Sequence, residues 1–168
     1  MKDQEKLSKL AFELIQNPET ATHSCISELF KVLTKIASAS PDLQTKVGSF
    51  VFDKKKKHVV LMACNDLPHN IAALPNRLKR PEKYNWIICS ERNLIYQAAY
   101  HGISLKNTVL FANRLPCIEC TKALIQSGIK NIILIGHIDE QIEQFTDIYI
   151  FIKDLCKEAK VSLHIYNV

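Results

Sequence analysis

The second half of the chain alternates between strand-like and helix-like patterns, and this alternation limits the fold more than any other feature. Short apolar segments predict strands at residues 108–112, 131–135 and 161–166. Helical spacing of apolar residues predicts helices at residues 90–102, at residues 117–128, and as one long helix at residues 142–159. Because strands that are joined by helices pair in parallel, the pattern predicts an α/β fold with parallel strands in one sheet.

The first half of the chain predicts two helices followed by a strand hairpin. Apolar residues recur with helical spacing over residues 7–15 and 26–37, and each run ends shortly before a proline. Residues 47–52 and 59–64 are expected to pair as strands, with the lysines between them in a solvated turn. Residues 65–83 contain three prolines and predict a long irregular loop, a kind of segment that is usually functional.

Composition narrows the classes of function. The chain has 168 residues, which is the length of one domain, and its 47% hydrophobic and 23% charged content is typical of globular proteins. Only four glycines occur, and they are too far apart to form the dinucleotide-binding fingerprint or the phosphate-binding P-loop. A net charge of +5 suits an anionic ligand, but it is too small for the basic stripe of a nucleic-acid-binding protein.

No segment of the sequence predicts export or a membrane anchor. The N-terminal residues mix acids with bases, and no apolar run approaches about 18 residues. We therefore expect a cytosolic protein without a membrane partner. In that reducing compartment six cysteines are poor candidates for disulfides, and clustered cysteines are better explained as metal ligands or catalytic groups.

Three of the cysteines stand at the starts of two predicted helices. Cys117 and Cys120 belong to a Pro-Cys-Ile-Glu-Cys motif, in which both sulfurs project toward one point. Alone, this motif is also typical of a redox pair or of half a structural zinc site. Cys89 adds a third sulfur at the other helix start, and Glu91 follows it by two residues.

Three sulfur ligands would leave the fourth position of a tetrahedral zinc ion open, as in catalytic zinc sites. A fourth protein ligand would close the site and make it structural, but the residues that flank Cys89 include no histidine or second cysteine. His101 lies more than two helical turns beyond Glu91 and is better placed to cap the helix end. The motifs therefore favour Zn²⁺ held by Cys89, Cys117 and Cys120.

The Cys-x-Glu and Pro-Cys-x-x-Cys motifs together resemble the zinc signature of the cytidine/deoxycytidylate deaminases. The likeness begins at about Ile26, and three further segments are similar to the deoxycytidylate branch: residues 45–48, 65–70 and 91–95. The resemblance implies a three-layer cytidine deaminase-like fold with a mixed five-stranded sheet flanked by helices. Residues 26–168 then form the deaminase domain, and residues 1–25 form an N-terminal helical extension.

Two features depart from the deoxycytidylate branch. That branch normally has histidine at the position of Cys89, and its Asn-Gly-Phe-Pro-x-Gly segment is replaced by one that contains Asp66, Leu67 and Asn70. The lost glycines argue against the allosteric nucleotide site of that branch. The Cys-Ser-Glu-Arg segment is instead similar to the Cys-Ala-Glu-Arg of tetrameric cytidine deaminases, which implies that Arg92 hydrogen-bonds the zinc sulfurs rather than lying on the surface.

The resemblance implies hydrolytic deamination of a cytosine ring, with dCMP converted to dUMP and ammonia. Glu91 is implied as the catalytic proton shuttle. The expected substrate contacts are Asn65, Ser90, Arg80 and Arg114. Other basic residues near the expected pocket are further candidates for the phosphate: Arg77, Lys79 and Lys83. We also expect the chain to bind a small-molecule pyrimidine nucleotide as its substrate and to form a homo-oligomer.

Two other functions stay open at this point. One is deamination of a nucleoside, a free base or an RNA adenosine by the same zinc chemistry. The other is a zinc-stabilised binding module that has no catalytic activity. The presence of Glu91 gives the second alternative no support from the sequence.

Overall fold

A computed structural model describes residues 2–168 of the chain. The helices are α1 (Lys2–Gln16), α2 (His23–Ser38), the 3₁₀ helix η1 (Pro75–Arg77), α3 (Lys83–Trp86), α4 (Ser90–Tyr100), α5 (Ile118–Gln126), α6 (Ile138–Gln144) and α7 (Thr146–Glu158). The strands are β1 (Gly48–Asp53), β2 (His58–Cys64), β3 (Val109–Ala112), β4 (Asn131–Gly136) and β5 (Ser162–Asn167). Within the described residues, no helix has the length and apolar character that crossing a membrane requires.

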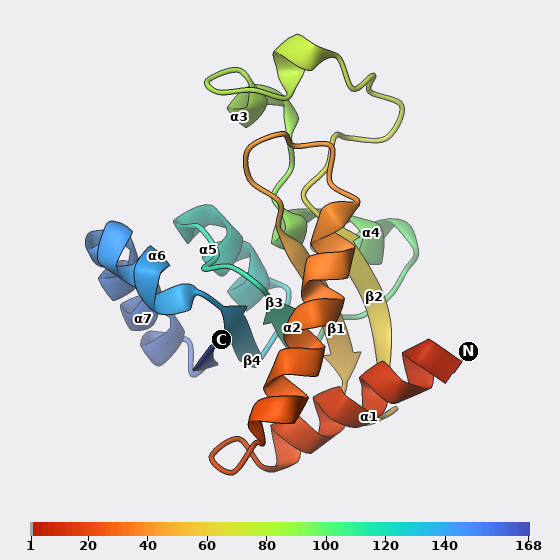
Figure 1. The fold of residues 1–168 in the computed structure, drawn as a ribbon, viewed down its shortest axis with the longest axis vertical. Helices are drawn as coiled ribbons and strands as arrows, with labels where there is room; N and C mark the ends of the chain where they lie inside the picture. The colour runs from red at the N-terminus through yellow and green to blue at the C-terminus, as the bar shows by residue number, and fades with distance from the viewer. Residues whose placement is uncertain (1) are drawn as a thin grey trace.

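The strands form one mixed sheet in the order β2-β1-β3-β4-β5 (Figure 1). β1 runs antiparallel to both β2 and β3, whereas β3, β4 and β5 are parallel. The alternating strands and helices after residue 90 thus produce the parallel part of the sheet, as predicted. The hairpin prediction is also confirmed, because residues 54–57 form the turn between β1 and β2.

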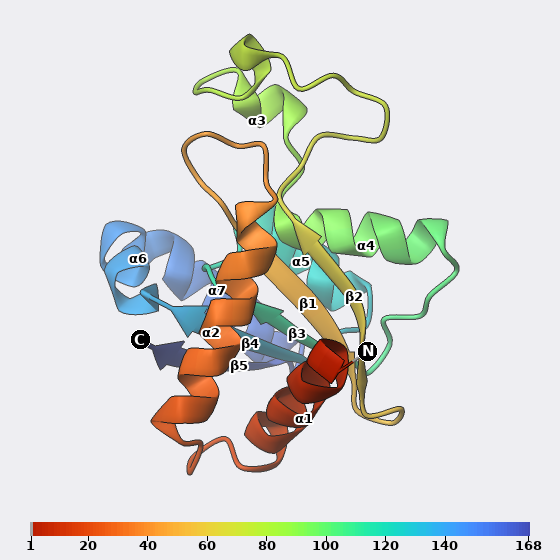
Figure 2. The same ribbon diagram turned by 45° about the vertical axis from the view of Figure 1, so that its right-hand side comes forward.

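Helices cover both faces of the sheet, which gives three layers (Figure 2). The strands sort their side chains by alternation: in β4, Ile132 and Leu134 enter one apolar cluster, and Ile133 and Ile135 enter the other. The first cluster packs against α4, α5 and α7, and the second packs against α1 and α2. The predicted three-layer α/β architecture is therefore confirmed, and α1 contributes to the same core as α2.

One close approach fixes the position of α2 over β1. A Cβ atom at Gly48, the first residue of β1, would lie 2.2 Å from the carbonyl oxygen of Leu33 in α2. Only glycine can occupy this position without moving one of the two backbones. The loop between α2 and β1 is therefore held at the end of the sheet where α4 and α5 begin (Figure 1).

The prediction of one long helix over residues 142–159 is wrong. The chain forms α6 and α7 instead, separated at Phe145, whose φ of −131° and ψ of 43° are not helical. The Thr146 hydroxyl donates to the carbonyl oxygens of Ile142 and Glu143, at 3.0 and 3.2 Å. These are acceptors that a continuous helix would give to backbone amides, so the side chain competes with the helix at this point.

Residues 66–86, which we call the projecting arm, extend beyond the end of the sheet (Figure 1). An isolated bridge between Asp66 and Ile88 closes its base, with backbone hydrogen bonds of 3.1 and 2.7 Å. The predicted irregular loop is therefore confirmed in the main, although it contains η1 and leads directly into α3. Figures 1 and 2 both place the arm beside the loop that joins α2 to β1.

Candidate active site

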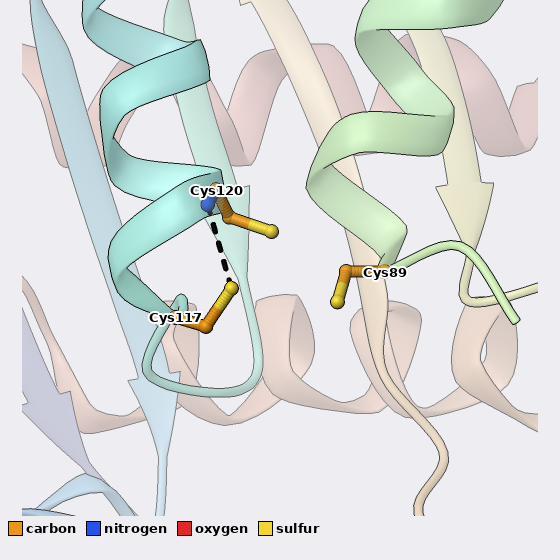
Figure 3. Close-up of side chains that lie close together, drawn as sticks. All are labelled: Cys89, Cys117 and Cys120. Atoms are coloured by element: carbon orange, nitrogen blue, oxygen red, sulfur yellow. Dashed lines mark hydrogen bonds between the residues drawn. The ribbon is translucent and has the colours of Figure 1, made fainter. Parts of the chain in front are cut away.

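Two helices begin side by side at the end of the sheet, and each begins directly after a cysteine. Cys89 is the N-cap residue of α4, and Cys117 is the N-cap residue of α5. Both residues are extended, and the Cys117 sulfur accepts a hydrogen bond from the Cys120 amide at 3.4 Å (Figure 3). The sulfur thus takes the role that an oxygen usually has at a helix start.

The sulfurs of Cys89, Cys117 and Cys120 point toward one another and all lie within 4.8 Å (Figure 3). Ligands at Zn–S distances of about 2.3 Å in a tetrahedron are about 3.8 Å apart, so a small contraction of this cluster fits the ion. Among residues 2–168, this is the one group of three histidine, cysteine or acidic side chains close enough to share a metal ion. The predicted sulfur ligands are therefore brought together.

The charge of the three thiols also suits a divalent cation. The neighbouring thiols of Cys120 and Cys89, together with the hydrogen bond from the Cys120 amide, lower the pKa of Cys117. The pKa of Cys120 is raised by the neighbouring sulfurs of Cys117 and Cys89 and by burial. One thiolate is thus favoured here and a further one is opposed. A cation at the centre of the cluster would remove that opposition.

Arg92 lies on the first turn of α4 beside the sulfurs. Its Nη2 atom donates to the Cys89 sulfur at 3.7 Å, and this hydrogen bond raises the pKa of the guanidinium despite partial burial. The Nε atom of Arg92 is buried without a hydrogen-bond partner. A guanidinium in this position offsets the negative charge of three thiolates, which is the contact that the sequence resemblance implies.

Glu91 lies on the same turn of α4 and faces a cavity next to the sulfurs. The residue is only 3% exposed, and burial, followed by the nearby Cys89 sulfur, raises the pKa of its carboxyl group to about 7. Its carboxylate is not part of the metal-binding cluster. A carboxyl group with a pKa near neutrality, beside a cation site but not ligating it, can both accept and donate a proton.

The cavity has a volume of about 580 Å³ and is partly open to solvent. Cys89, Cys117 and Glu91 are among the residues that line it. Its walls include apolar side chains from the α5 and α7 regions: Leu115, Ile118, Phe145 and Ile148. A cavity with apolar walls and a few convergent polar groups is typical of a site for a small ligand.

Two of the predicted basic residues, Arg80 and Arg114, line this cavity. The pKa of Arg114 is lowered, first by burial and then by the positive charge of Arg80. Arg114 is half-buried and Arg80 is exposed, and the repulsion between their guanidinium groups favours an anionic ligand beside them.

The structure places the other three basic candidates differently. Lys83 reaches the cavity wall, but its ammonium group is bound by Asp42 at 2.8 Å. Arg77 stacks on the Trp86 ring, with 4.0 Å between its Cζ atom and the ring centroid. Lys79 is exposed and does not line the cavity.

The two remaining predicted contacts are engaged within the protein. Asn65 borders the cavity, but its Nδ2 atom donates to Asp42 at 3.2 Å and to the Thr45 carbonyl at 2.8 Å. Its Oδ1 atom accepts from the Val47 amide at 2.8 Å. Ser90 is completely buried and its hydroxyl donates to the Ala63 carbonyl at 2.8 Å, so it points into the sheet and not into the cavity.

Sequence reasoning missed several residues that border the site. One is Asp42, which forms a buried ion pair with Lys83 at the cavity wall. Another is Gln141, which accepts from the Leu115 amide at 2.9 Å and lines the cavity with Arg114. Phe145 falls within the predicted helix of residues 142–159, but it lines the cavity at the break between α6 and α7. No local signal in the sequence marks Asp42 or Lys83 as buried, because charged residues are common in loops.

Comparison with known sequences gives a consistent result. A sequence model of the cytidine and deoxycytidylate deaminase zinc-binding region matches residues 23–135. The chain is 28% identical over 111 residues to a probable deoxycytidylate deaminase of Drosophila melanogaster, covering 60% of this chain and 53% of that protein. It is 29% identical over 106 residues to the deoxycytidylate deaminase of Homo sapiens, covering 60% and 58%. The chain thus spans a little over half the length of these curated relatives.

Solved structures share the fold. The dCMP deaminase of cyanophage S-TIM5, in complex with dCMP and dUMP, superposes with a TM-score of 0.66 at 18% identity, covering 86% of this chain and 98% of that one. A diaminohydroxyphosphoribosylaminopyrimidine deaminase and reductase of Thermotoga maritima has a TM-score of 0.52 at 19% identity, with coverage of 86% and 37%. The TM-scores show that these proteins share the three-layer fold, and at identities this low the likeness shows the fold alone.

Proposed function

The chain belongs to the cytidine and deoxycytidylate deaminase family, and from that membership we propose that it converts dCMP and water to dUMP and ammonia. One observation carries the proposal: a buried carboxyl group, Glu91, faces a cavity directly beside three converging sulfurs. Two curated deoxycytidylate deaminases among the relatives support the choice of substrate.

Cys89, Cys117 and Cys120 would hold the metal. Zinc bound by three protein ligands supplies a water molecule of lowered pKa as the nucleophile for a hydrolytic reaction. Arg92 reduces the negative charge of the sulfurs through its hydrogen bond to Cys89. The apolar cavity wall limits the water that can surround the reacting ring.

Glu91 moves the protons. Its carboxylate takes a proton from the attacking water and delivers it to the ring nitrogen next to the amino-bearing carbon. The same carboxylate then takes the remaining proton from the hydroxyl group added to the ring carbon and gives it to the amino group, so that the carbon–nitrogen bond breaks, ammonia leaves and the oxygen becomes the carbonyl of the product. Burial of Glu91, which raises the pKa of the carboxyl group to about 7, makes both directions of transfer accessible near neutral pH.

Arg80 and Arg114 would bind the 5′-phosphate. Both line the cavity, and the positive charge of Arg80 adds to burial in lowering the pKa of Arg114. A phosphate between the two side chains would relieve this repulsion and accept hydrogen bonds from both. This arrangement favours a nucleotide over a nucleoside as substrate.

The cytosolic location and the homo-oligomer are proposed on other grounds. All six cysteines are free in the described part of the chain, which is compatible with a reducing compartment. Exposed apolar side chains on α7, at Ile150 and Phe151, are candidates for coverage by a second copy.

Ammonia release from a panel of bases, nucleosides and nucleotides tests the proposal, with zinc content measured on the same sample. We expect dCMP to be the best substrate, with a kcat/KM at least about tenfold above deoxycytidine, because one charged hydrogen bond is worth about 1.5–3 kcal/mol. A ratio near one would move the function to a nucleoside or base deaminase. Release of ammonia from no member of the panel would favour a zinc-stabilised binding module.

A further inference from the structure

We propose that the buried Asp42–Lys83 pair is a positioning device that holds the projecting arm against the loop before β1, so that Arg80 faces the cavity. Asp42 and Lys83 are positioning residues in this account, because they act through Arg80 and not on the substrate. The inference rests on the proposed function, since it assigns to the pair a share in phosphate recognition.

The pair is dry and fully engaged. The side chains of Lys83 and Asp42 are 5% and 3% exposed, and the Lys83 ammonium donates to both carboxylate oxygens, at 3.1 and 2.8 Å. Its third hydrogen bond goes to the Thr45 hydroxyl at 3.2 Å. All three protons of the ammonium group thus have partners within the chain, which leaves none for a substrate.

The Asp42 carboxylate also accepts hydrogen bonds from other groups, and these fix its position. It accepts from the amides of Gln44 and Thr45 at 2.8 and 3.0 Å and from the Asn65 side chain at 3.2 Å. Burial alone would raise the pKa of this carboxyl group, but the hydrogen bonds from Lys83 and the two amides hold the pKa below its usual range. The carboxylate therefore stays charged, and the arm meets a fixed negative group.

The chain connects this anchor to Arg80 in a few steps. The Lys83 amide donates to the Lys79 carbonyl at 2.9 Å, and the Arg80 amide donates to the Gln44 side chain at 2.8 Å. The segment around Arg80 is thus fixed to the residue 42–45 turn at two points, one through Lys83 and one through Gln44. Without the Lys83 contact, the segment that carries Arg80 would keep only the hydrogen bond to Gln44.

Stability alone does not explain the pair. Buried ion pairs are often no better for folding than apolar residues of similar volume, because both charges lose their hydration. Their better attested use is to fix one arrangement of segments over another. Here the two segments belong to different parts of the chain and meet at the cavity wall, where the position of a cationic side chain affects binding.

The test is Lys83→Met in the full chain, with Lys55→Met on the exposed β1–β2 turn as the matched control. We expect faster hydrogen exchange in residues 66–82 and a KM for dCMP raised about tenfold with little change in kcat, as expected for loss of one oriented charged contact. The KM for deoxycytidine should stay the same, because it carries no phosphate. General destabilisation would instead impair both substrates alike.

A double variant, Asp42→Asn with Lys83→Met, guards against an unpaired buried carboxylate that prevents folding. It carries neither buried charge, and we expect the same KM shift and the same faster exchange. Unchanged exchange of residues 66–82 in both variants, or an unchanged dCMP preference in the double variant, would overturn the proposal.

The exchange measurement also separates this proposal from the proposed function. If the parent chain releases no ammonia from dCMP, the proposed function fails while the exchange of the arm still reports whether the pair holds it. If the parent deaminates dCMP and the arm exchanges identically with and without Lys83, the enzyme assignment stands and the positioning role is refuted.

Discussion

The N-termini of α2 and α5 have similar capping geometry, but the cysteine on the first turn of each helix has very different surroundings. In α2, the Thr22 hydroxyl accepts from the Cys25 amide at 3.2 Å. In α5, the Cys117 sulfur accepts from the Cys120 amide at 3.4 Å. Each helix thus has a buried cysteine three residues after its capping residue, on opposite faces of one sheet.

The two cysteines differ in what surrounds them. The Cys25 thiol donates to the Leu10 carbonyl at 3.6 Å inside an apolar core, where burial and then the charge of Glu13 raise its pKa. Cys120 lies instead among the sulfurs of Cys89 and Cys117. Cys25, which follows a threonine cap, is therefore a core residue. Cys120, which follows a cysteine cap, is a candidate metal ligand.

The largest expected effect separates these two cysteines. Cys120→Ala should release the metal and reduce deamination at least about a thousandfold, because two sulfurs do not form the three-ligand site. Cys25→Ala should retain the metal and lose only stability. Zinc content and dCMP turnover are measured for both variants. Retained zinc in Cys120→Ala would show that Cys120 is not a metal ligand.

The next effect concerns the charge beside the sulfurs. Arg92→Ala should weaken zinc retention or slow turnover about 10- to 100-fold, as expected for the loss of a hydrogen bond to a metal ligand. The control is Lys130→Ala, because Lys130 is exposed and does not line the cavity. Cys89→His in the Arg92→Ala background should partly restore the metal, because a neutral ligand removes one negative charge. No rescue would show that Arg92 does not act through charge.

A smaller effect is expected at the wall of the cavity. Arg114→Gln should reduce the ratio of kcat/KM for dCMP to that for deoxycytidine about tenfold, since it removes one charged hydrogen-bond donor. The nucleoside rate should be spared. Equal losses for the two substrates would show that Arg114 supports the fold and not the phosphate.

The smallest effect is expected at the start of α2. Thr22→Ala removes a side-chain cap and should reduce the free energy of unfolding by about 1 kcal/mol, without changing zinc content or turnover. Chemical denaturation and metal analysis on one preparation measure both. A loss of zinc in this variant would mean that the two faces of the sheet are not independent.

Much of this architecture was predictable because its signals are local. Helical and strand periodicity identified the strands and most helices, and the cysteine motifs identified a cluster that the fold then brings within 4.8 Å. Spacing in the sequence was informative here because each sulfur stands at a helix start, where the direction of the chain is well defined.

The parts that could not be predicted depend on contacts between distant segments. Periodicity through Phe145 is helical, and only the structure shows that the Thr146 hydroxyl donates to carbonyl oxygens of the preceding turn. Lys83 was one of several basic residues in a loop, and its partner Asp42 lies in another loop. No local pattern distinguishes a lysine that will be buried by a carboxylate from one that binds an anion.

The central claim is that Glu91 moves protons beside a metal that it does not bind, and Glu91→Gln tests it most directly. The variant should keep the fold and a full complement of zinc while its kcat for dCMP falls at least about 10²–10⁴-fold, the usual contribution of a proton shuttle to one step. Zinc content and ammonia release are measured on the same sample, beside the parent. Turnover within about tenfold of the parent, with zinc retained, would contradict the account.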